Sequence, residues 1–177
     1  MRIKRVAVGI MIAFMLLMIS TPVSKAAEII NVTPSASLTT LDKVVAKKYT
    51  ANDLKYLSCI IWCEAGNQSY SGKIAVGVVI MNRKRSHSFP NSVKGVIYQR
   101  GQFSPTSNGA MKKALKAYTA GKFKHGDRLK CVKAATAALN GQTYVSSKGK
   151  KVKFNRMFYF SRSLSHAKIR IGAHRFK

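Results

Sequence analysis

Acidic residues are scarce in this sequence. Five Asp and Glu stand against 32 Lys and Arg, so the 177 residues carry a formal charge of +27. A surface that only keeps a protein soluble usually mixes both signs of charge. An uncompensated positive field instead draws a protein to polyanions, such as nucleic acid, anionic lipid or cell-wall polymers. The scarcity also restricts any carboxyl-based catalysis to very few positions.

Cysteine is almost as rare. The three cysteines, Cys59, Cys63 and Cys131, are too few and odd in number for a disulfide framework. Cys59 and Cys63 lie one helical turn apart and either could reach Cys131, whereas burial as small apolar side chains is the alternative. A zinc site needs more ligands at closer spacing, and the four histidines form no paired motif. The sequence therefore predicts no metal and no cofactor.

No apolar run reaches the ~18 to 20 residues of a membrane-spanning helix. Residues 6–19 are apolar, follow a basic start and precede small residues at positions 24 and 26. This pattern is typical of a signal peptide over residues 1–26, and an uncleaved anchor is the alternative. Cleavage removes four of the 32 basic residues and leaves 28 against five acidic ones, a net charge of +23. We expect a protein that is secreted or associated with the cell wall, without a stable membrane anchor.

The rest of the chain divides into a linker and one folded domain. Residues 27–49 carry scattered Thr, Ser and Pro with little periodicity. Residues 50–177 are long enough for one domain with a single core. We expect this domain to be a monomer.

Helices dominate the predicted domain. Thr50 and Asp53 form a capping-box pattern, which predicts a helix that runs to about residue 65. Residues 71–85 are apolar nearly all round, which predicts a buried helix, and Gly77 within it would allow close packing. Further helices are expected at 93–98, 110–120 and 128–139, loops at 86–91 and 99–109, and strands at 143–145, 152–154, 157–160 and 169–176. The fold class is therefore α+β and mainly helical, with a short C-terminal β-hairpin or sheet.

Glu64 is the acidic residue whose position has no structural explanation. Asp53 begins a helix, two acids lie in the linker, and Asp127 follows a glycine where a turn is expected. Glu64 comes three and four residues after Ile61 and Ile60, so its carboxyl projects from an apolar stripe. Its place in the last helical turn also disfavours an anion. Both effects raise its pKa and favour the protonated acid that protonates a glycosidic oxygen, whereas an ion pair is the alternative.

Several segments carry a family resemblance. They are residues 57–65 and 70–83, Phe89-Pro90 with Val96-Ile97-Tyr98, Gly101-Gln102-Phe103-Ser104, Phe158-Tyr159-Phe160 and residues 171–176. In this order they resemble the SleB-type cell wall hydrolase family, which includes the spore cortex-lytic enzymes. The resemblance covers about residues 50–177. Asn67-Gln68 stand where that family often has a charged residue.

This resemblance implies a fold and a reaction. The fold would be a small lysozyme-like domain, and the substrate would be the peptidoglycan glycan strand, cut between N-acetylmuramic acid and N-acetylglucosamine. Glu64 matches the family's acid/base. Similar members are lytic transglycosylases, in which the muramoyl 6-hydroxyl attacks the anomeric carbon and no second carboxylate is needed. A two-carboxylate glycosidase needs a partner acid about 5 to 9.5 Å away, and only Asp127 is a candidate.

Six further residues are expected to line a glycan groove: Gln102, Phe103, Ser104, Tyr159, Asn82 and His174. Aromatic faces stack on sugars, and amide and hydroxyl groups bond their polar substituents. Each residue also has a structural alternative. Phe103 and Tyr159 would instead pack in the protein interior. Asn82 would cap or bridge helices, and His174 would form a structural hydrogen bond.

A non-enzymic protein is the competing hypothesis. A cationic chain of this kind could bind anionic wall polymers or disrupt membranes through its charge alone. That hypothesis makes every acidic residue dispensable and leaves Glu64 on an apolar face unexplained. We expect peptidoglycan and anionic wall polymers as partners, in the vegetative wall or the spore. We expect no nucleic-acid partner, because no nucleic-acid motif is present and export separates the protein from such ligands.

Overall fold

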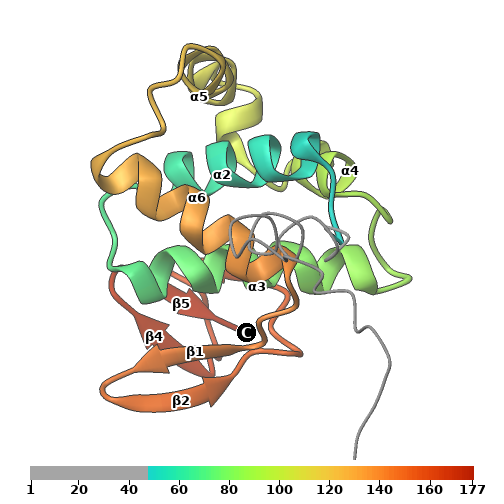
Figure 1. Cartoon of the computed structure of the whole chain (residues 1–177). Helices are drawn as coiled ribbons and strands as arrows, with labels where there is room; N and C mark the ends of the chain where they lie inside the picture. Colours follow the sequence, from blue (N-terminus) through green and yellow to red (C-terminus); the bar gives the residue numbers. More distant parts are fainter. Residues whose placement is uncertain (1–47) are drawn as a thin grey trace, which may run out of the picture. The chain divides into compact units, whose positions relative to one another are not determined.

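A computed structural model describes residues 48–177 (Figure 1). The predicted signal peptide and nearly all of the predicted linker lie outside the described residues. The helices are α2 (Ala51–Ala65), α3 (Tyr70–Arg85), α4 (Val93–Tyr98), the 3-10 turn η1 (Ser104–Thr106), α5 (Ala110–Thr119) and α6 (Gly126–Leu139). The strands are β1 (Tyr144–Ser147), β2 (Lys150–Lys153), β3 (Phe160–Ser161), β4 (Ile169–Ile171) and β5 (His174–Phe176). The predicted α+β, mainly helical class is confirmed.

The start of α2 is held by the predicted capping box. The Asp53 amide donates to the Thr50 hydroxyl (3.0 Å), and the Thr50 amide donates to the Asp53 carboxylate (3.1 Å). These two bonds satisfy backbone donors that a helix start leaves without partners. The helix ends at Ala65, as the sequence predicted, and its last turn carries Glu64.

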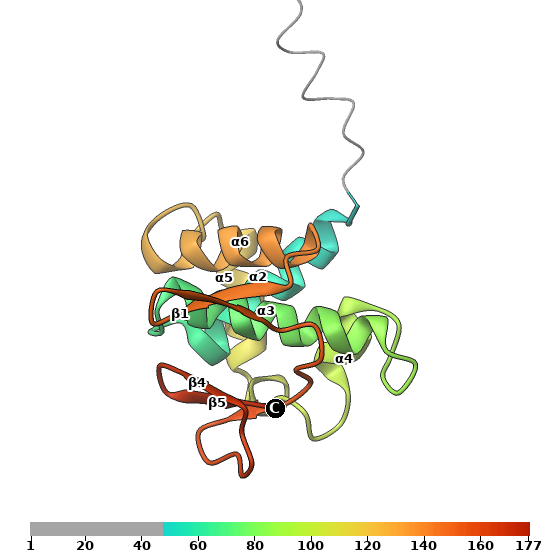
Figure 2. The same cartoon turned by 90° about the horizontal axis from the view of Figure 1, so that it is seen from below.

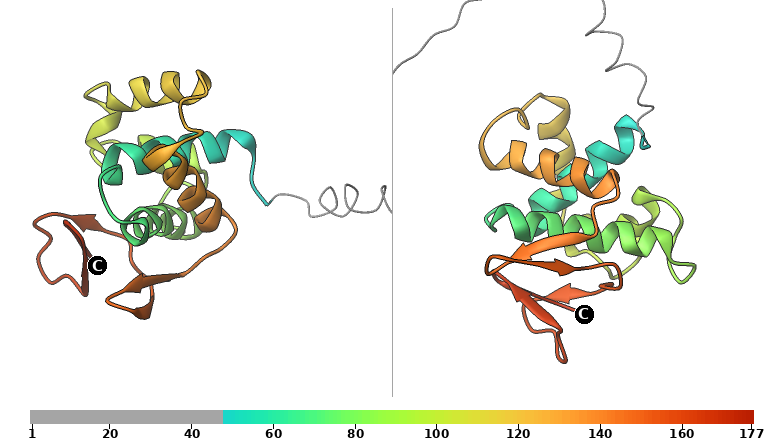
Figure 3. Two further views of the ribbon diagram at one scale, coloured as in Figure 1. Left: turned by 60° about the vertical axis from the view of Figure 1, so that its left-hand side comes forward. Right: turned by 60° about the horizontal axis from the view of Figure 1, so that its bottom comes forward.

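Helix α3 is the centre of the core. Twelve consecutive residues of this helix are buried, so it is enclosed on all sides, as its continuous apolar pattern predicts. Helices α2 and α6 lie on one side of α3, and the strands lie on the other side (Figures 1 and 3); Figure 2 views the domain from the side of the strands. A side chain at Gly77 would press against Ala138 and Ile61, so this glycine lets the three helices approach closely. None of the helices within residues 48–177 is long and apolar enough to cross a membrane.

The strands form two small antiparallel sheets. Strands β1 and β2 make a hairpin, and the second sheet has the order β3-β5-β4. The prediction of one strand over residues 169–176 is wrong, because the chain reverses at Gly172 (φ 58°) and pairs β4 with β5. The prediction for 157–160 was also too long, since only Phe160 of that stretch joins a strand. The expected loop at 99–109 contains the turn η1.

Candidate active site

Glu64 lies where two surface hollows meet. The first hollow has a volume of about 540 Å³ and is lined by Trp62, Lys113 and Arg128 among others. The second, of about 430 Å³, runs past η1 to the C-terminal strands. Cys63, Glu64 and Arg162 belong to both. The two hollows therefore form one continuous groove with Glu64 at its middle.

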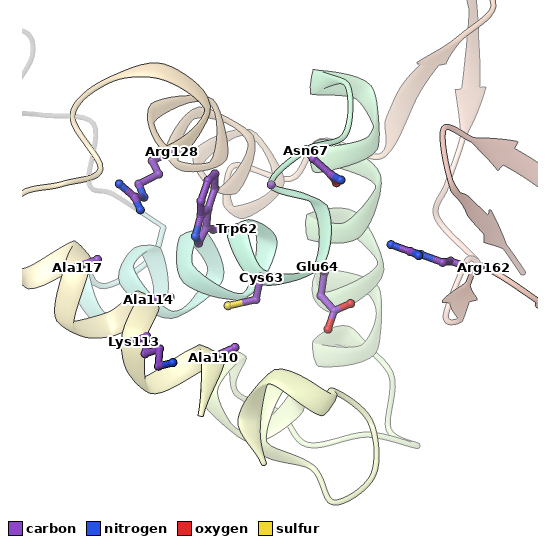
Figure 4. Close-up of a pocket in the computed structure, with 11 residues that line it drawn as sticks. Trp62, Cys63, Glu64, Asn67, Ala110, Lys113, Ala114, Ala117, Arg128 and Arg162 are labelled. Atoms are coloured by element: carbon purple, nitrogen blue, oxygen red, sulfur yellow. The ribbon is translucent and has the colours of Figure 1, made fainter. Parts of the chain in front are cut away.

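The electrostatics around Glu64 favour its protonated form. Burial raises the pKa of this half-buried carboxyl above its ordinary value, because desolvation penalises the anion. Among residues 48–177, no Lys or Arg forms an ion pair with it. In Figure 4 its carboxyl group points into the groove, and Arg162 extends toward the same space from the C-terminal strands. The group can thus give up and regain a proton within the groove.

The other two acids of the described part have structural partners. Asp53 belongs to the capping box of α2. Asp127 pairs with Lys130 (3.2 Å) and Lys73 (3.6 Å). A hydrogen bond from Lys130, followed by the charges of both lysines, lowers the pKa of Asp127. Asp127 lines neither hollow, and the expectation that it sits in a turn is wrong, because it lies in the first turn of α6.

Lys73 fixes the chain that follows Glu64. Its side chain is fully buried in α3, and its ammonium group donates to the carbonyls of Gly66 (2.9 Å) and Gln68 (2.5 Å). The ion pair with Asp127 adds α6 to the same cluster. A lysine inside the apolar run 71–85 was a visible signal that the sequence analysis did not use. Its buried charge is compensated by these three acceptors.

Four of the six expected groove residues lie in the second hollow. Gln102, Phe103, Ser104 and His174 line it together with Glu64. Gln102 and Ser104 are exposed, whereas Phe103 is largely buried and offers the groove only one side of its ring. Segments that are far apart in the sequence thus meet in one place.

Tyr159 and Asn82 do not line either hollow. Tyr159 is about half exposed (47%) and its ring lies 5.4 Å from the guanidinium of Arg83. Asn82 is buried, and its amide donates to the carbonyls of Phe154 and Met157 (2.9 Å). Asn82 therefore ties α3 to the C-terminal segment, which is a structural role other than the expected capping or bridging of helices.

Arginines of the groove were missed by the sequence analysis. Arg83 lines the second hollow, and its Nε donates to the carbonyl of Phe158 (2.7 Å). Arg128 stands over the ring of Trp62 at 4.9 Å and lines the first hollow. Arginines are common in this basic chain, so no local pattern marked these positions.

A hydrogen bond joins the segment between α2 and α3 to the hairpin of β4 and β5, beside His174. The amide of Ala173 donates to the side-chain oxygen of Gln68 (3.0 Å). Gln68 is one of the two uncharged residues that stand where the resembled family often has a charged residue. In this structure it anchors the turn between β4 and β5. Burial lowers the pKa of His174 below its ordinary value, which keeps the imidazole neutral.

The cysteines are free thiols. Burial raises the pKa of Cys63 to about 11 and the pKa values of Cys59 and Cys131 to about 12. Thiols with such values are protonated near neutral pH and are poor nucleophiles, although Cys63 lies in the groove. Within residues 48–177, no group of three or more His, Cys, Asp or Glu side chains could hold a metal ion.

A mainly helical domain with one half-buried carboxyl group in an open groove is the arrangement expected of a lysozyme-like domain with a single candidate acid. The family model described as Cell Wall Hydrolase matches residues 67–177, which is more than half of the chain. The chain therefore belongs to the cell wall hydrolase family. The matched stretch begins after Glu64, so the role of that residue stays a prediction.

Curated relatives and solved structures agree with this family. The spore cortex-lytic enzyme of Bacillus cereus is 37% identical over 65 residues, which cover 37% of this chain and 25% of the relative. That of Bacillus subtilis is 38% identical over 61 residues, covering 34% and 20%. The chain thus matches a quarter or less of the length of these relatives.

Two solved catalytic domains share the fold. The catalytic domain of the Bacillus cereus SleB protein has a TM-score of 0.53 at 25% identity, covering 72% of this chain and 91% of that domain. The catalytic domain of the germination-specific lytic transglycosylase SleB from Bacillus anthracis gives the same score and identity, with coverage of 75% and 98%. The predicted lysozyme-like architecture is thereby confirmed.

Proposed function

We propose that this domain cleaves the glycan strand of peptidoglycan between N-acetylmuramic acid and N-acetylglucosamine, with Glu64 as its acid/base. The observation that carries the proposal is the position of Glu64, a half-buried carboxyl at the middle of an open groove. Membership of the cell wall hydrolase family supports the substrate. The names of the relatives, which are spore cortex-lytic enzymes, point to the same polymer.

Glu64 would act first as an acid and then as a base. Its protonated carboxyl gives a proton to the glycosidic oxygen, and the bond from that oxygen to the anomeric carbon of muramic acid breaks. The resulting carboxylate then takes the proton of the muramoyl 6-hydroxyl while that oxygen attacks the anomeric carbon. A 1,6-anhydro ring forms, Glu64 is protonated again, and no water is consumed. A raised pKa suits the first step, because the acid must be protonated near neutral pH.

We favour a transglycosylase over a hydrolase because the described residues include too few free carboxylates for a hydrolase. A hydrolase of the common kind needs a second carboxylate to activate water or to form a covalent intermediate. Among residues 48–177 the only other acids are Asp53 and Asp127, and each is held by the structural partners described above. An intramolecular nucleophile removes the need for a second acid. One structural neighbour is itself titled a germination-specific lytic transglycosylase.

The groove residues have complementary roles in this proposal. Gln102 and Ser104 offer exposed polar groups beside Glu64 that can bond sugar hydroxyls. Trp62 forms a wall of the other hollow, and an aromatic face there can stack on a sugar ring. Tyr159 lines neither hollow, so it stays a candidate for contact with the glycan strand farther from Glu64. The predicted export signal would place this activity outside the cytoplasm, at the vegetative wall or the spore cortex.

Mass analysis of digestion products tests the mechanism. Purified peptidoglycan would be digested with the wild-type domain and with Asp127→Asn, and the ends of the muropeptides identified. We expect 1,6-anhydro ends from both proteins. Reducing muramic-acid ends, together with loss of activity in Asp127→Asn, would replace the transglycosylase by a two-carboxylate hydrolase. Peptidoglycan without any new glycan ends would refute glycan cleavage itself.

A further inference from the structure

A third hollow, separate from the groove of Glu64, is lined by both sheets. Its volume is about 640 Å³, and none of its lining residues lines either hollow of the groove. The hairpin of β1 and β2 forms one side, and β4 with the turn after it forms the other side (Figure 1). Three cationic side chains line it: Lys148, Lys150 and Arg170. No acidic side chain lines it, and none within residues 48–177 forms an ion pair with these three.

Lys148 occupies a strained position beside this hollow. Lys148 and Gly149 form the two-residue turn between β1 and β2, and both have a positive φ (48° and 76°). Such turns prefer Asn or Asp before the glycine, because few other L residues adopt this conformation without strain. An asparagine would relieve the strain, so the lysine at this position points to a role for its charge.

Arg170 lies in an electrostatically unfavourable position. In the register of β4 and β5 it pairs with Arg175, and like charges directly opposite each other destabilise a sheet. Its Nε donates to the carbonyl of Gly172 (3.0 Å), which orients the guanidinium beside the hollow. The terminal amino groups of an arginine form a fork that fits two oxygens of one anionic group. A bound anion would therefore offset the repulsion between the two arginines.

The rest of the lining narrows the class of anion. Val152 and Ile169 are half-buried apolar side chains, which lower the local dielectric constant and strengthen attraction between opposite charges. Neither is exposed, as insertion into a membrane surface would require. No aromatic side chain lines the hollow, so it lacks the stacking platform with which proteins bind single-stranded nucleic acid. An anionic chain without bases or acyl groups fits these features.

We propose that this hollow binds a cell-wall polymer linked by phosphodiesters, such as a polyol phosphate chain. Arg170 holds one phosphodiester through paired hydrogen bonds, and Lys148 and Lys150 neutralise its charge from the hairpin side. A phosphodiester fits better than a carboxylate, because the oxygens of a tetrahedral phosphate point in several directions and can meet cations on two sides. Wall polymers are the relevant anions because the chain belongs to a cell wall hydrolase family. The inference does not depend on glycan cleavage or on Glu64.

Strand β2 supplies a matched control for the test. Lys150 lines the hollow, whereas Lys151 and Lys153 do not. Two variants that lose the same charge would be compared: Lys148→Gln/Lys150→Gln and Lys151→Gln/Lys153→Gln. Calorimetry would measure their affinities for an oligomer of glycerol phosphate. We expect a loss of at least ~10-fold for the first variant and of less than ~3-fold for the second.

A second polymer and a second kind of variant test the chemistry of the ligand. Poly-glutamate with the same number of charges should bind the wild type at least ~3-fold more weakly than the glycerol phosphate oligomer. Arg170→Lys keeps the charge but loses the fork, so it should lose this preference. Sedimentation with walls, in the Glu64→Gln protein, should show less binding after hydrofluoric acid has removed the phosphodiester-linked polymers.

Several outcomes would overturn the proposal. Equal losses in the two lysine variants would show that only total charge matters. Equal affinity of the wild type for the two polymers would mean that the hollow does not select phosphodiesters. Unchanged binding to acid-treated walls would exclude a wall polymer of this class, and binding to phosphatidylglycerol vesicles without binding to the oligomer would assign the site to lipid.

The variants keep these outcomes interpretable. All the substituted lysines and Arg170 are exposed, so the variants should fold, and circular dichroism checks this. Cleavage of phosphate-free peptidoglycan should be the same in both lysine variants as in the wild type. Loss of the proposed cleavage and loss of polymer binding are therefore read separately.

Discussion

The helical part of the domain (48–139) and the strand part (140–177) are built on different chemistry. All three acidic residues of the described chain, Asp53, Glu64 and Asp127, lie in the helical part. The strand part has no acidic residue and ten Lys or Arg. The helical part also holds the enclosed helix α3, whereas the strands are short, and of these β5 alternates buried and exposed residues while β2 has no buried residue.

The comparison shows how the groove is made. The helical part supplies the acid, on a helix whose end is fixed by Lys73, and the strand part supplies cationic and aromatic residues such as Arg162 and Phe160. Neither part forms the groove alone. The contacts that join the two parts therefore shape the groove, and each can be tested separately from Glu64.

The largest expected effect comes from removing the acid of the helical part. Glu64→Gln keeps the size and polarity of the side chain but cannot transfer a proton. We expect the rate of peptidoglycan cleavage to fall by at least ~10²- to 10⁴-fold, with wall binding unchanged. Turbidity loss and muropeptide release measure the rate, and sedimentation with walls measures binding. Full activity in this variant would contradict the role of Glu64 as the acid/base.

A second substitution breaks the junction between the two parts. Gly172 has φ 58°, and a Cβ there would collide with the side-chain oxygen of Gln68. We expect Gly172→Ala to lower the free energy of unfolding by about 2 to 3 kcal/mol, from backbone strain and loss of the contact. The measurement is thermal or urea unfolding followed by circular dichroism.

Gly149 provides a matched control for this change. It has φ 76° in the turn between β1 and β2, and a Cβ there meets no atom within 4 Å. Gly149→Ala should therefore cost only the strain of about 1 kcal/mol. Equal costs at the two glycines would mean that the Gln68 contact does not contribute to the junction.

The pH dependence of stability tests the environment of Glu64. Its pKa is raised above the ordinary value of 4.5, so the folded protein holds a proton that the unfolded chain releases. Stability due to this group is therefore highest below about pH 4.5 and falls as the pH rises through the raised pKa. Glu64→Gln lacks this loss, so the melting temperature of the variant relative to that of the wild type should rise as the pH increases from 4 to 7. A difference that stays constant over this range would contradict the buried acid.

The smallest expected effect concerns the surface charge of the strand part. Lys150, Lys151 and Lys153 lie on β2, in a region without acidic residues. Replacing all three by Gln should weaken wall binding roughly 3- to 10-fold at low salt, and the difference should disappear at molar salt because screening acts within about 3 Å there.

The charge-matched control replaces Lys112, Lys116 and Lys133 in the helical part. These lysines are also exposed, and the variant has the same net charge. We expect a smaller loss of wall binding, because the carboxylates of the helical part already moderate its field. Identical losses in the two variants would show that only total charge matters.

The sequence predicted the helical part well because its signals are local. The bounds of α2 follow from Thr50 and its capping partner, and the burial of α3 follows from its apolar pattern. Such signals depend on residues within one or two turns of each other. The wrong prediction for Asp127 has an equally local cause, because the helix was predicted to begin at residue 128 and α6 begins at Gly126. Glu64 could be singled out as the candidate acid because its apolar surroundings are also visible along one helix.

Only the tertiary structure decided how the strand part completes the site. The bond from Arg83 to Phe158 and the bond from Ala173 to Gln68 join residues that are 75 and 105 positions apart in the sequence. No periodicity of the chain encodes these pairs. The sequence by itself determined the charge, the helices and the candidate acid, because these depend on composition and nearby residues. Which arginine, histidine and ring meet that acid depends on packing between the two parts, which exists only in the folded domain.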